Sequence, residues 1–171
     1  MSIAVTYPPQ VFIREIDMNR AFGVGAQRRT SWLLDTNILS ELLKLNPDPI
    51  VSAWIDGQPR SSLFISSVTV MEIRFGLSRM PIGARRTARE AAFSAAMSVD
   101  FHKRILPLDQ QSAEEAGRLA AARAAIGRPV GSNDTMIAGI ALANGMGIVT
   151  RNIGDFHGLD VPLVNPFDAR S

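Results

Sequence analysis

Four acidic residues lie where an α/β protein gathers its functional side chains. Asp35 directly follows a short apolar run, and Asp155 lies just beyond another one. Glu72 and Asp134 fall in the first turns of segments with helical spacing. Carboxylates gathered at one point repel each other unless a cation lies among them, and oxygen-only ligands favour hard cations. The set therefore predicts a site for Mg²⁺, with Mn²⁺ as the alternative, that could activate water and neutralise charge on a phosphodiester.

Each of these acids also has a purely structural explanation, which the sequence alone leaves open. Asp35 could cap the helix that follows it, and Glu72 could close a capping box that begins three residues earlier. The capping box fails if Ser67 is the cap of that helix instead. Asn133 and Asp134 at a helix start could be ordinary capping residues, with Asp134 complementing the helix dipole, and Asp155 could simply be a turn residue.

The elements that must position these acids alternate between strand and helix. Periodic stretches predict helices over residues 37–43, 48–57, 68–79, 84–99, 109–126 and 133–144, with Asn37 and Asp109 as caps. Short apolar runs predict strands at residues 32–34, 63–65, 104–108, 148–150 and 161–164. This alternation predicts an α/β fold with a central parallel sheet flanked by helices on both faces. In such sheets the ligand site lies beyond the carboxyl ends of the strands.

Length and composition fit one folded domain. The chain has 171 residues, of which 46% are hydrophobic and 20% charged, enough for a substantial core. Residues 1–30 show no period, and we interpret them as an N-terminal extension that is poorly ordered or peripheral. Residues 31–168 are the predicted domain.

Several function classes lack their signatures. There is no cysteine, so disulfides and thiolate ligands are excluded, and the net charge of +2 permits an anionic partner without indicating one. We find no membrane span, no signal peptide, no phosphate-binding glycine loop and no zinc or triad spacing around the two histidines. A cytoplasmic location is the resulting expectation. Arg85, Arg86 and Arg89 form a basic helix face, which is either a solvated surface or a nucleic-acid contact.

Six short segments, taken in order, carry a family resemblance. Over about residues 32–167 the chain resembles PIN-domain proteins, and among them the VapC and FitB type toxins of bacterial type II toxin–antitoxin pairs. No single motif is specific, but the ordered set is. The segments are Leu33-Leu34-Asp35-Thr36-Asn37, Ser66-Ser67-Val68-Thr69-Val70-Met71-Glu72-Ile73, Arg104-Ile105-Leu106-Pro107-Leu108-Asp109, Asn133-Asp134-Thr135-Met136-Ile137-Ala138, Val149-Thr150-Arg151-Asn152 and Asp155-Phe156.

The resemblance implies a PIN fold and a Mg²⁺-dependent endoribonuclease. Asp35, Glu72 and Asp134 match the first three carboxylates of the family's site. RNA would be the substrate, and hydrolysis would need no covalent intermediate. The resemblance further implies a homodimer and a small cognate antitoxin that blocks the site, so that DNA is contacted only through the antitoxin.

The likeness is weaker at the fourth acid of the site. Thr36 and Thr150 match small hydroxyl residues that line the family's site, but Asn152 stands where a further acid often lies. Asp155 could supply the missing charge, either as a ligand or by orienting water. This departure leaves the presence of a second metal ion open.

Two other functions compete with the ribonuclease toxin. An aspartyl-phosphate hydrolase would need a second aspartate where Asn37 stands and a late lysine, and no lysine follows Lys103. A PIN domain with weakened catalysis that serves as a binding or regulatory module is left open by Asn152. We adopt the ribonuclease toxin as the prediction.

Overall fold

The computed structural model describes residues 30–128 and 131–168. The predicted extension over residues 1–30 lies outside this range except for its last residue, so it stays a prediction. Among the described residues, no helix combines the length and the apolar character that crossing a membrane requires.

Five parallel strands form one sheet in the order β3-β2-β1-β4-β5. Their bounds are β1 (Trp32–Leu34), β2 (Leu63–Ser66), β3 (Ile105–Leu106), β4 (Gly147–Val149) and β5 (Leu163–Val164). The predicted α/β fold with a parallel sheet is therefore confirmed. Both edge strands are shorter than predicted, because Pro107 follows β3 and Pro162 precedes β5, and proline cannot donate a ladder hydrogen bond.

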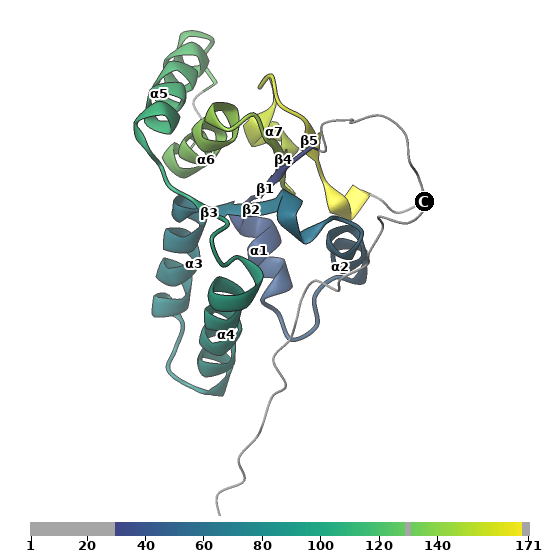
Figure 1. Cartoon of the computed structure of the whole chain (residues 1–171). Helices are drawn as coiled ribbons and strands as arrows, with labels where there is room; N and C mark the ends of the chain where they lie inside the picture. The colour runs from purple at the N-terminus through teal and green to yellow at the C-terminus, as the bar shows by residue number, and fades with distance from the viewer. Residues whose placement is uncertain (1–29, 129–130, 169–171) are drawn as a thin grey trace, which may run out of the picture.

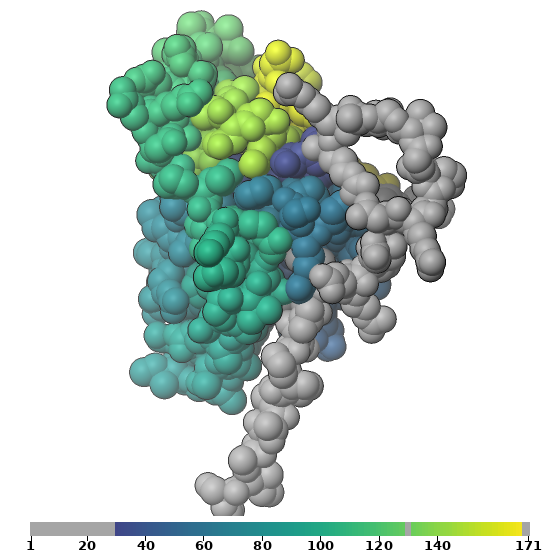
Figure 2. All heavy atoms as spheres, viewed as in Figure 1, coloured from purple at the N-terminus to yellow at the C-terminus, as the bar shows by residue number. Residues whose placement is uncertain are grey.

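Seven helices within the described residues cover both faces of the sheet. They are α1 (Thr36–Leu42), α2 (Pro49–Asp56), α3 (Ser67–Arg79), α4 (Ala84–Ala95), α5 (Gln110–Ala125), α6 (Ser132–Ala143) and α7 (Ile153–Phe156). Helices α5, α6 and α7 lie on one side and α1 to α4 on the other, as Figure 1 and the space-filling view in Figure 2 show. The one-turn helix α7 was not predicted, since four residues are too few to show a period.

The core lies in two layers, one on each face of the sheet. Leu33 packs in a cluster with Ile137 from α6, whereas its neighbour Leu34 packs in a second cluster with Ile38 and Phe93. Successive strand residues point to opposite faces, so a central strand needs apolar residues at every position. This explains why β1 reads as an unbroken apolar run.

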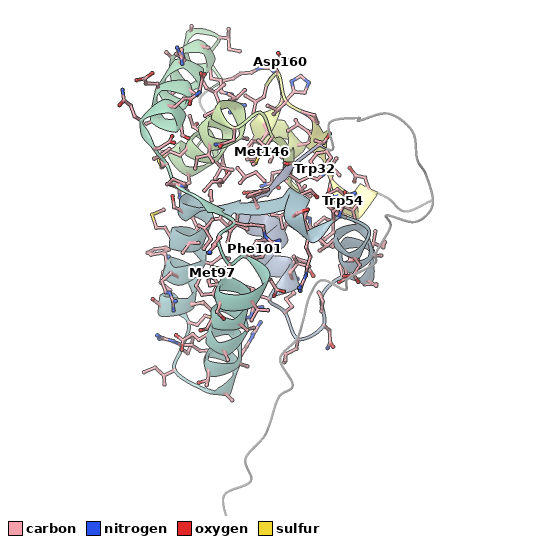
Figure 3. All side chains as sticks on the ribbon, in the orientation of Figure 1. Trp32, Trp54, Met97, Phe101, Met146 and Asp160 are labelled. Atoms are coloured by element: carbon pink, nitrogen blue, oxygen red, sulfur yellow. The ribbon has the colours of Figure 1, made fainter. Side chains whose placement is uncertain are left out.

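Aromatic packing fixes the amino-terminal end of the central strands. The rings of Trp32 and Trp54 meet edge-on with centroids 5.8 Å apart, and Figure 3 shows them side by side. Gly147 opens β4 next to this pair, and a Cβ atom there would collide with the ring of Trp32. The absence of a side chain thus allows β4 to approach β1 closely.

An ionic cluster around a buried carboxylate lies at the same end of the sheet. The residues involved are Arg60 and Arg104, which precede β2 and β3, and Asp100, the last residue of a π-helical turn, η3 (Ala96–Asp100). Arg60 donates from Nη2 to Asp100 Oδ1 at 2.9 Å, and Arg104 Nη1 donates to the carbonyl of Arg60 at 2.6 Å. Burial raises the pKa of Asp100, and the two arginines oppose that shift.

Candidate active site

Asp35 follows β1 and is the N-cap of α1. Its Oδ1 accepts a hydrogen bond from the backbone N–H of Thr36 at 2.6 Å, so the predicted cap at Asn37 is wrong. Capping does not account for the second oxygen, because Oδ2 accepts from the Thr150 hydroxyl at 2.8 Å and from Asn37 Nδ2 at 3.3 Å. Only 2% of Asp35 is exposed, so a carboxylate is held in the interior between β1 and β4.

Glu72 has no capping role. Helix α3 is capped by Ser66, whose hydroxyl accepts from the backbone N–H of Thr69 at 2.8 Å, so both predicted alternatives, the capping box and a Ser67 cap, are wrong. The carboxylate of Glu72 instead accepts from the Thr36 hydroxyl at 2.5 Å and from Asn133 Nδ2 at 2.8 Å. Glu72 is therefore oriented by residues from α1 and α6 toward the end of β1.

Asp134 and Asp155 lie inside helices. Helix α6 starts at Ser132 with Gly131 as a cap that offers no side chain, so Asp134 is in the first turn and does not cap. Asp155 lies in α7, so the alternative that it is simply a turn residue is wrong. No hydrogen bond from another described residue reaches either carboxylate, so their oxygens are open to other partners.

Electrostatic coupling shows that the four predicted acids come together. The pKa of Asp134 is raised to about 6, first by burial and then by repulsion from Asp35, Asp155 and Glu72, with Arg123 opposing the shift. Like charges raise a carboxyl pKa only at short range in a poorly solvated site. The sequence thus identified the four acids that the fold gathers at the carboxyl edge of the sheet.

Burial also dominates at Asp35. It raises the pKa of this carboxyl, and the nearby charge of Glu72 adds to the effect. The hydrogen bonds from Thr150, Thr36 and Asn37 act in the opposite direction, because they stabilise the charged form. Keeping Asp35 ionised in this buried position therefore costs free energy, which a bound cation would offset.

The smaller polar residues of the site support the acids. Thr36 and Thr150 donate to Glu72 and Asp35 respectively, which places both hydroxyls where the sequence predicted them. Asn152 is exposed, and it is its backbone N–H that donates to the Thr150 hydroxyl at 3.0 Å. Asn152 thus acts through its backbone on the residue that holds Asp35.

Two residues of the site were missed in the sequence. Asn133 was assigned to capping, although it bonds Glu72 across 61 positions. Arg123 of α5 is buried, and its Nη2 donates to the carbonyl of His157 at 3.4 Å. A signal for Arg123 existed, because it continues the inward helical spacing of Ser112 and Ala116.

The donor set fits a hard cation, although the described residues do not form a ready-made cage. No three His, Asp or Glu side chains among residues 30–128 and 131–168 converge closely enough to hold a metal ion directly. Asp35 and Glu72 already accept hydrogen bonds, whereas Asp134 and Asp155 do not. The oxygens of Asp134 and Asp155 are therefore the ones that a hydrated cation such as Mg²⁺ could reach, since Mg²⁺ keeps several waters and binds proteins through one or two carboxylates.

Comparison with known proteins identifies the family. The sequence matches the PIN domain over residues 32–160. The chain belongs to the PIN-domain family. Its relatives include the VapC ribonuclease Y4jK of Sinorhizobium fredii, 37% identical over 80% of this chain and 97% of that protein. They also include the toxin FitB of Neisseria gonorrhoeae, 30% identical over 79% of this chain and 97% of that protein.

Solved structures agree with this PIN-domain assignment. FitAB bound to a DNA fragment matches with a TM-score of 0.74 and 29% identity, over 82% of this chain and 98% of that one. DNA-bound VapBC from Salmonella typhimurium matches with a TM-score of 0.69 and 27% identity, over 81% of this chain and 99% of that one. The PIN fold implied by the resemblance is therefore confirmed.

Proposed function

We propose that this PIN-domain protein is a Mg²⁺-dependent endoribonuclease and the toxin of a type II toxin–antitoxin pair. The observation that carries the proposal is the gathering of four carboxylates at one edge of the sheet, with the pKa of Asp134 raised to about 6. The names of its relatives, which include a tRNA(fMet)-specific endonuclease VapC of Shigella flexneri, support RNA as the substrate class. The protein would act in the cytoplasm, where RNA is available.

Asp35 and Asp134 would hold the ion, with Glu72 joining directly or through water. When bound, Mg²⁺ would neutralise charge on the phosphodiester and acidify a water molecule. Each oxygen of Glu72 accepts one hydrogen bond and keeps a further lone pair, which could reach the ion itself or a water bound to it. Asp134 is suited to direct contact, because its carboxylate accepts none from the described residues.

The remaining groups prepare the attack on RNA. Thr150 fixes the orientation of Asp35 through its hydroxyl, and the backbone of Asn152 fixes Thr150 in turn. Asp155 has a carboxylate that no described residue binds, so it can accept a hydrogen bond from the attacking water. A water oriented in line with the scissile P–O bond needs no covalent intermediate on the protein.

The test compares two aspartates at the starts of helices: Asp134 in the first turn of α6 and Asp109 at the N-cap of α5. Asp134→Asn should abolish cleavage of single-stranded RNA in Mg²⁺, lowering the rate at least 100-fold, because it removes the charge that binds the ion. Asp109→Asn is the matched control, since Asp109 caps α5 through the backbone N–H of Ser112 and stands outside the charges acting on Asp134. Asparagine caps nearly as well as aspartate, so this control should cleave normally.

Full cleavage of RNA by the Asp134→Asn protein would contradict the proposed mechanism. A wild-type protein that binds RNA but cleaves none across a Mg²⁺ and Mn²⁺ titration would favour the alternative, a catalytically weakened binding or regulatory module. Asn152 is the residue that keeps this alternative open, since it supplies no charge where the family often has a further acid.

An antitoxin and a second copy of the chain are the proposed protein partners. The matched structures of FitAB and VapBC are toxin–antitoxin complexes, which supports a cognate antitoxin here. Helix α3 also exposes Met71 and Phe75, by 51% and 63%, on one face. The predicted basic face on α4 is less open, because Arg86 donates to Glu90 and to backbone carbonyls of Ser78 and Met80.

These partners can be tested directly. Light scattering of the purified chain at micromolar concentration should report a dimer. Co-expression with the neighbouring short reading frame should yield a complex that suppresses RNA cleavage. A monomer that no neighbouring gene product binds would count against the toxin assignment while leaving the nuclease assignment intact.

A further inference from the structure

Arg151 stands one residue beyond the hydroxyl that holds Asp35. Consecutive Cα atoms are about 3.8 Å apart, so the side chain of Arg151 starts at the rim of the carboxylate site. It is exposed, whereas Thr150 is fully buried. Within the described part of the chain it forms no ion pair with any of the four acids, and its guanidinium lies over a ring instead.

An aromatic ring fixes the position of this guanidinium. The Cζ atom of Arg151 lies 4.8 Å from the ring centroid of Phe167, which belongs to the short helix η4 (Pro166–Asp168) just beyond β5. The ring is held in turn, because it packs against the core and its backbone N–H donates to Asn165 Oδ1 at 3.2 Å. A cation over an aromatic face keeps its N–H edge available while losing freedom of movement.

The donors of Arg151 have no acceptor among the described residues. Arg60, Arg86 and Arg118 each pair with a carboxylate. Arg151 forms no ion pair within the described part of the chain. The acidic residue of η4, Asp168, does not pair with Arg151; its carboxylate accepts a hydrogen bond from Asn165 Nδ2 at 2.9 Å. An exposed, immobilised guanidinium with a free N–H edge is suited to a phosphate, which it can bind in bidentate fashion.

We propose that Arg151, held over Phe167, is a substrate-binding residue that takes the RNA phosphate next to the one that is cut. This inference rests on the proposed nuclease function and deepens it. A flanking phosphate is the better match than the scissile one, because the guanidinium lies over Phe167 of η4, beyond β5, and forms no ion pair with the four acids. Arg151 would place the strand so that the next phosphodiester lies over the acids.

The chain offers a matched control with the same chemistry elsewhere. Arg79 lies over the ring of Phe75, with its Cζ atom 5.5 Å from the centroid, and both residues belong to α3. Because α3 begins at the carboxyl edge and has 13 residues, Arg79 at its far end lies about 18 Å from that edge. Arg151→Gln and Arg79→Gln therefore remove the same kind of arginine–ring contact, the first beside the carboxylate site and the second far from it.

The experiment measures binding of a labelled single-stranded RNA 12-mer of mixed sequence in the Asp134→Asn background, so that nothing is cut. Arg151→Gln should raise the dissociation constant about 10-fold, as expected for loss of a hydrogen bond to a charged group. The slope of log K against log salt should fall by about 0.7, the value for one phosphate contact on a single strand. Arg79→Gln should change neither quantity.

Arg151→Lys extends the test in case the glutamine variant folds poorly. It keeps the charge, so the salt slope should stay near that of the unchanged background while binding weakens by less than with glutamine. An unchanged dissociation constant for Arg151→Gln, in a protein whose wild type cleaves RNA, would overturn this inference and leave the nuclease assignment standing. Equal losses in Arg151→Gln and Arg79→Gln would also overturn it, since they would show general attraction of RNA to positive charge.

Discussion

Two clusters of charged residues lie at opposite ends of the sheet, and they are built differently. At the amino-terminal end, one buried carboxylate, Asp100, has two arginines beside it and pairs with Arg60 at 2.9 Å. At the carboxyl end, four carboxylates act on one another, and the charge that opposes them comes from Arg123. None of these four acids takes part in an ion pair within the described part of the chain.

The difference is the one we expect between a structural cluster and the proposed functional one. A buried charge that is paired and hydrogen-bonded can be retained for stability, whereas unbalanced buried charges destabilise the folded protein. Groups with perturbed pKa values tend to gather at functional sites for this reason. The carboxyl edge therefore carries a repulsion that a cation would relieve, whereas the carboxylate of the amino-terminal cluster already has an arginine partner.

The largest effects should come from removing one acid from each cluster. Asp100→Asn should lower the free energy of unfolding by about 3 kcal/mol, because it leaves two arginines beside a neutral group. RNA cleavage measured well below the melting temperature should persist. Asp35→Asn should do the opposite: cleavage should fall at least 100-fold, while stability without metal stays level or rises.

Urea unfolding in EDTA and cleavage assays in Mg²⁺ measure these two properties on the same preparations. Asparagine at position 35 can still cap α1, so loss of the cap does not confuse the comparison. If both variants lost stability and kept activity, the carboxyl edge would be a second structural cluster and the contrast would be wrong.

A smaller effect should appear as a dependence on pH. In the folded protein the pKa of Asp134 is about 6, against 3.8 for an ordinary, solvated aspartate as in the unfolded chain. Protonation therefore stabilises the fold, and in EDTA the free energy of unfolding should decline as pH rises from about 4 to about 6. Cleavage should show the reverse, since it requires the ionised form of Asp134, and it should decline as the pH is lowered and protons compete with Mg²⁺ for this carboxylate.

The difference between wild type and Asp134→Asn isolates this contribution from all other titrating groups. Melting temperatures should converge near pH 4 and separate toward pH 7, with the asparagine variant the more stable one in EDTA. Two curves that run parallel across this range would show that Asp134 does not titrate as described.

These comparisons also show what the sequence could and could not predict. The acids Asp35 and Asp155 were found because each lies just after an apolar run, and the parallel sheet followed from the alternation of strands and helices. The hydrogen bond from Asn133 to Glu72 could not be predicted, because it joins residues 61 positions apart whose proximity depends on the packing of α6 against α3. Local rules assigned Asn133 to a cap instead.

The cap of α3 is a second feature that local sequence rules did not predict. Ser66, Ser67 and Thr69 are all good cap residues, and a helix starts wherever the strand before it ends. Strand β2 runs through Ser66, one residue beyond its predicted end, and pairs there with Leu106 of β3. The length of a strand depends on its neighbour in the sheet, and single-sequence patterns do not contain that information.

The smallest predicted effect concerns Arg123, the cation that acts on the acidic cluster at the carboxyl edge of the sheet. Its charge favours ionised Asp134, and by the same attraction it lowers the negative potential that a metal ion would meet. Arg123→Met should therefore raise Mg²⁺ affinity about fivefold, corresponding to about 1 kcal/mol for one partly screened charge. Arg118→Met is the control, since Arg118 lies on the same helix, is 67% exposed and pairs with Glu115. Calorimetric titration with Mg²⁺ measures the change, with melting curves confirming that both variants fold.

Weaker Mg²⁺ binding by a well-folded Arg123→Met protein would show instead that Arg123, through its bond to the carbonyl of His157, positions α7 and Asp155 for the ion. The sign of the change thus distinguishes a charge that opposes the metal from a side chain that builds its site.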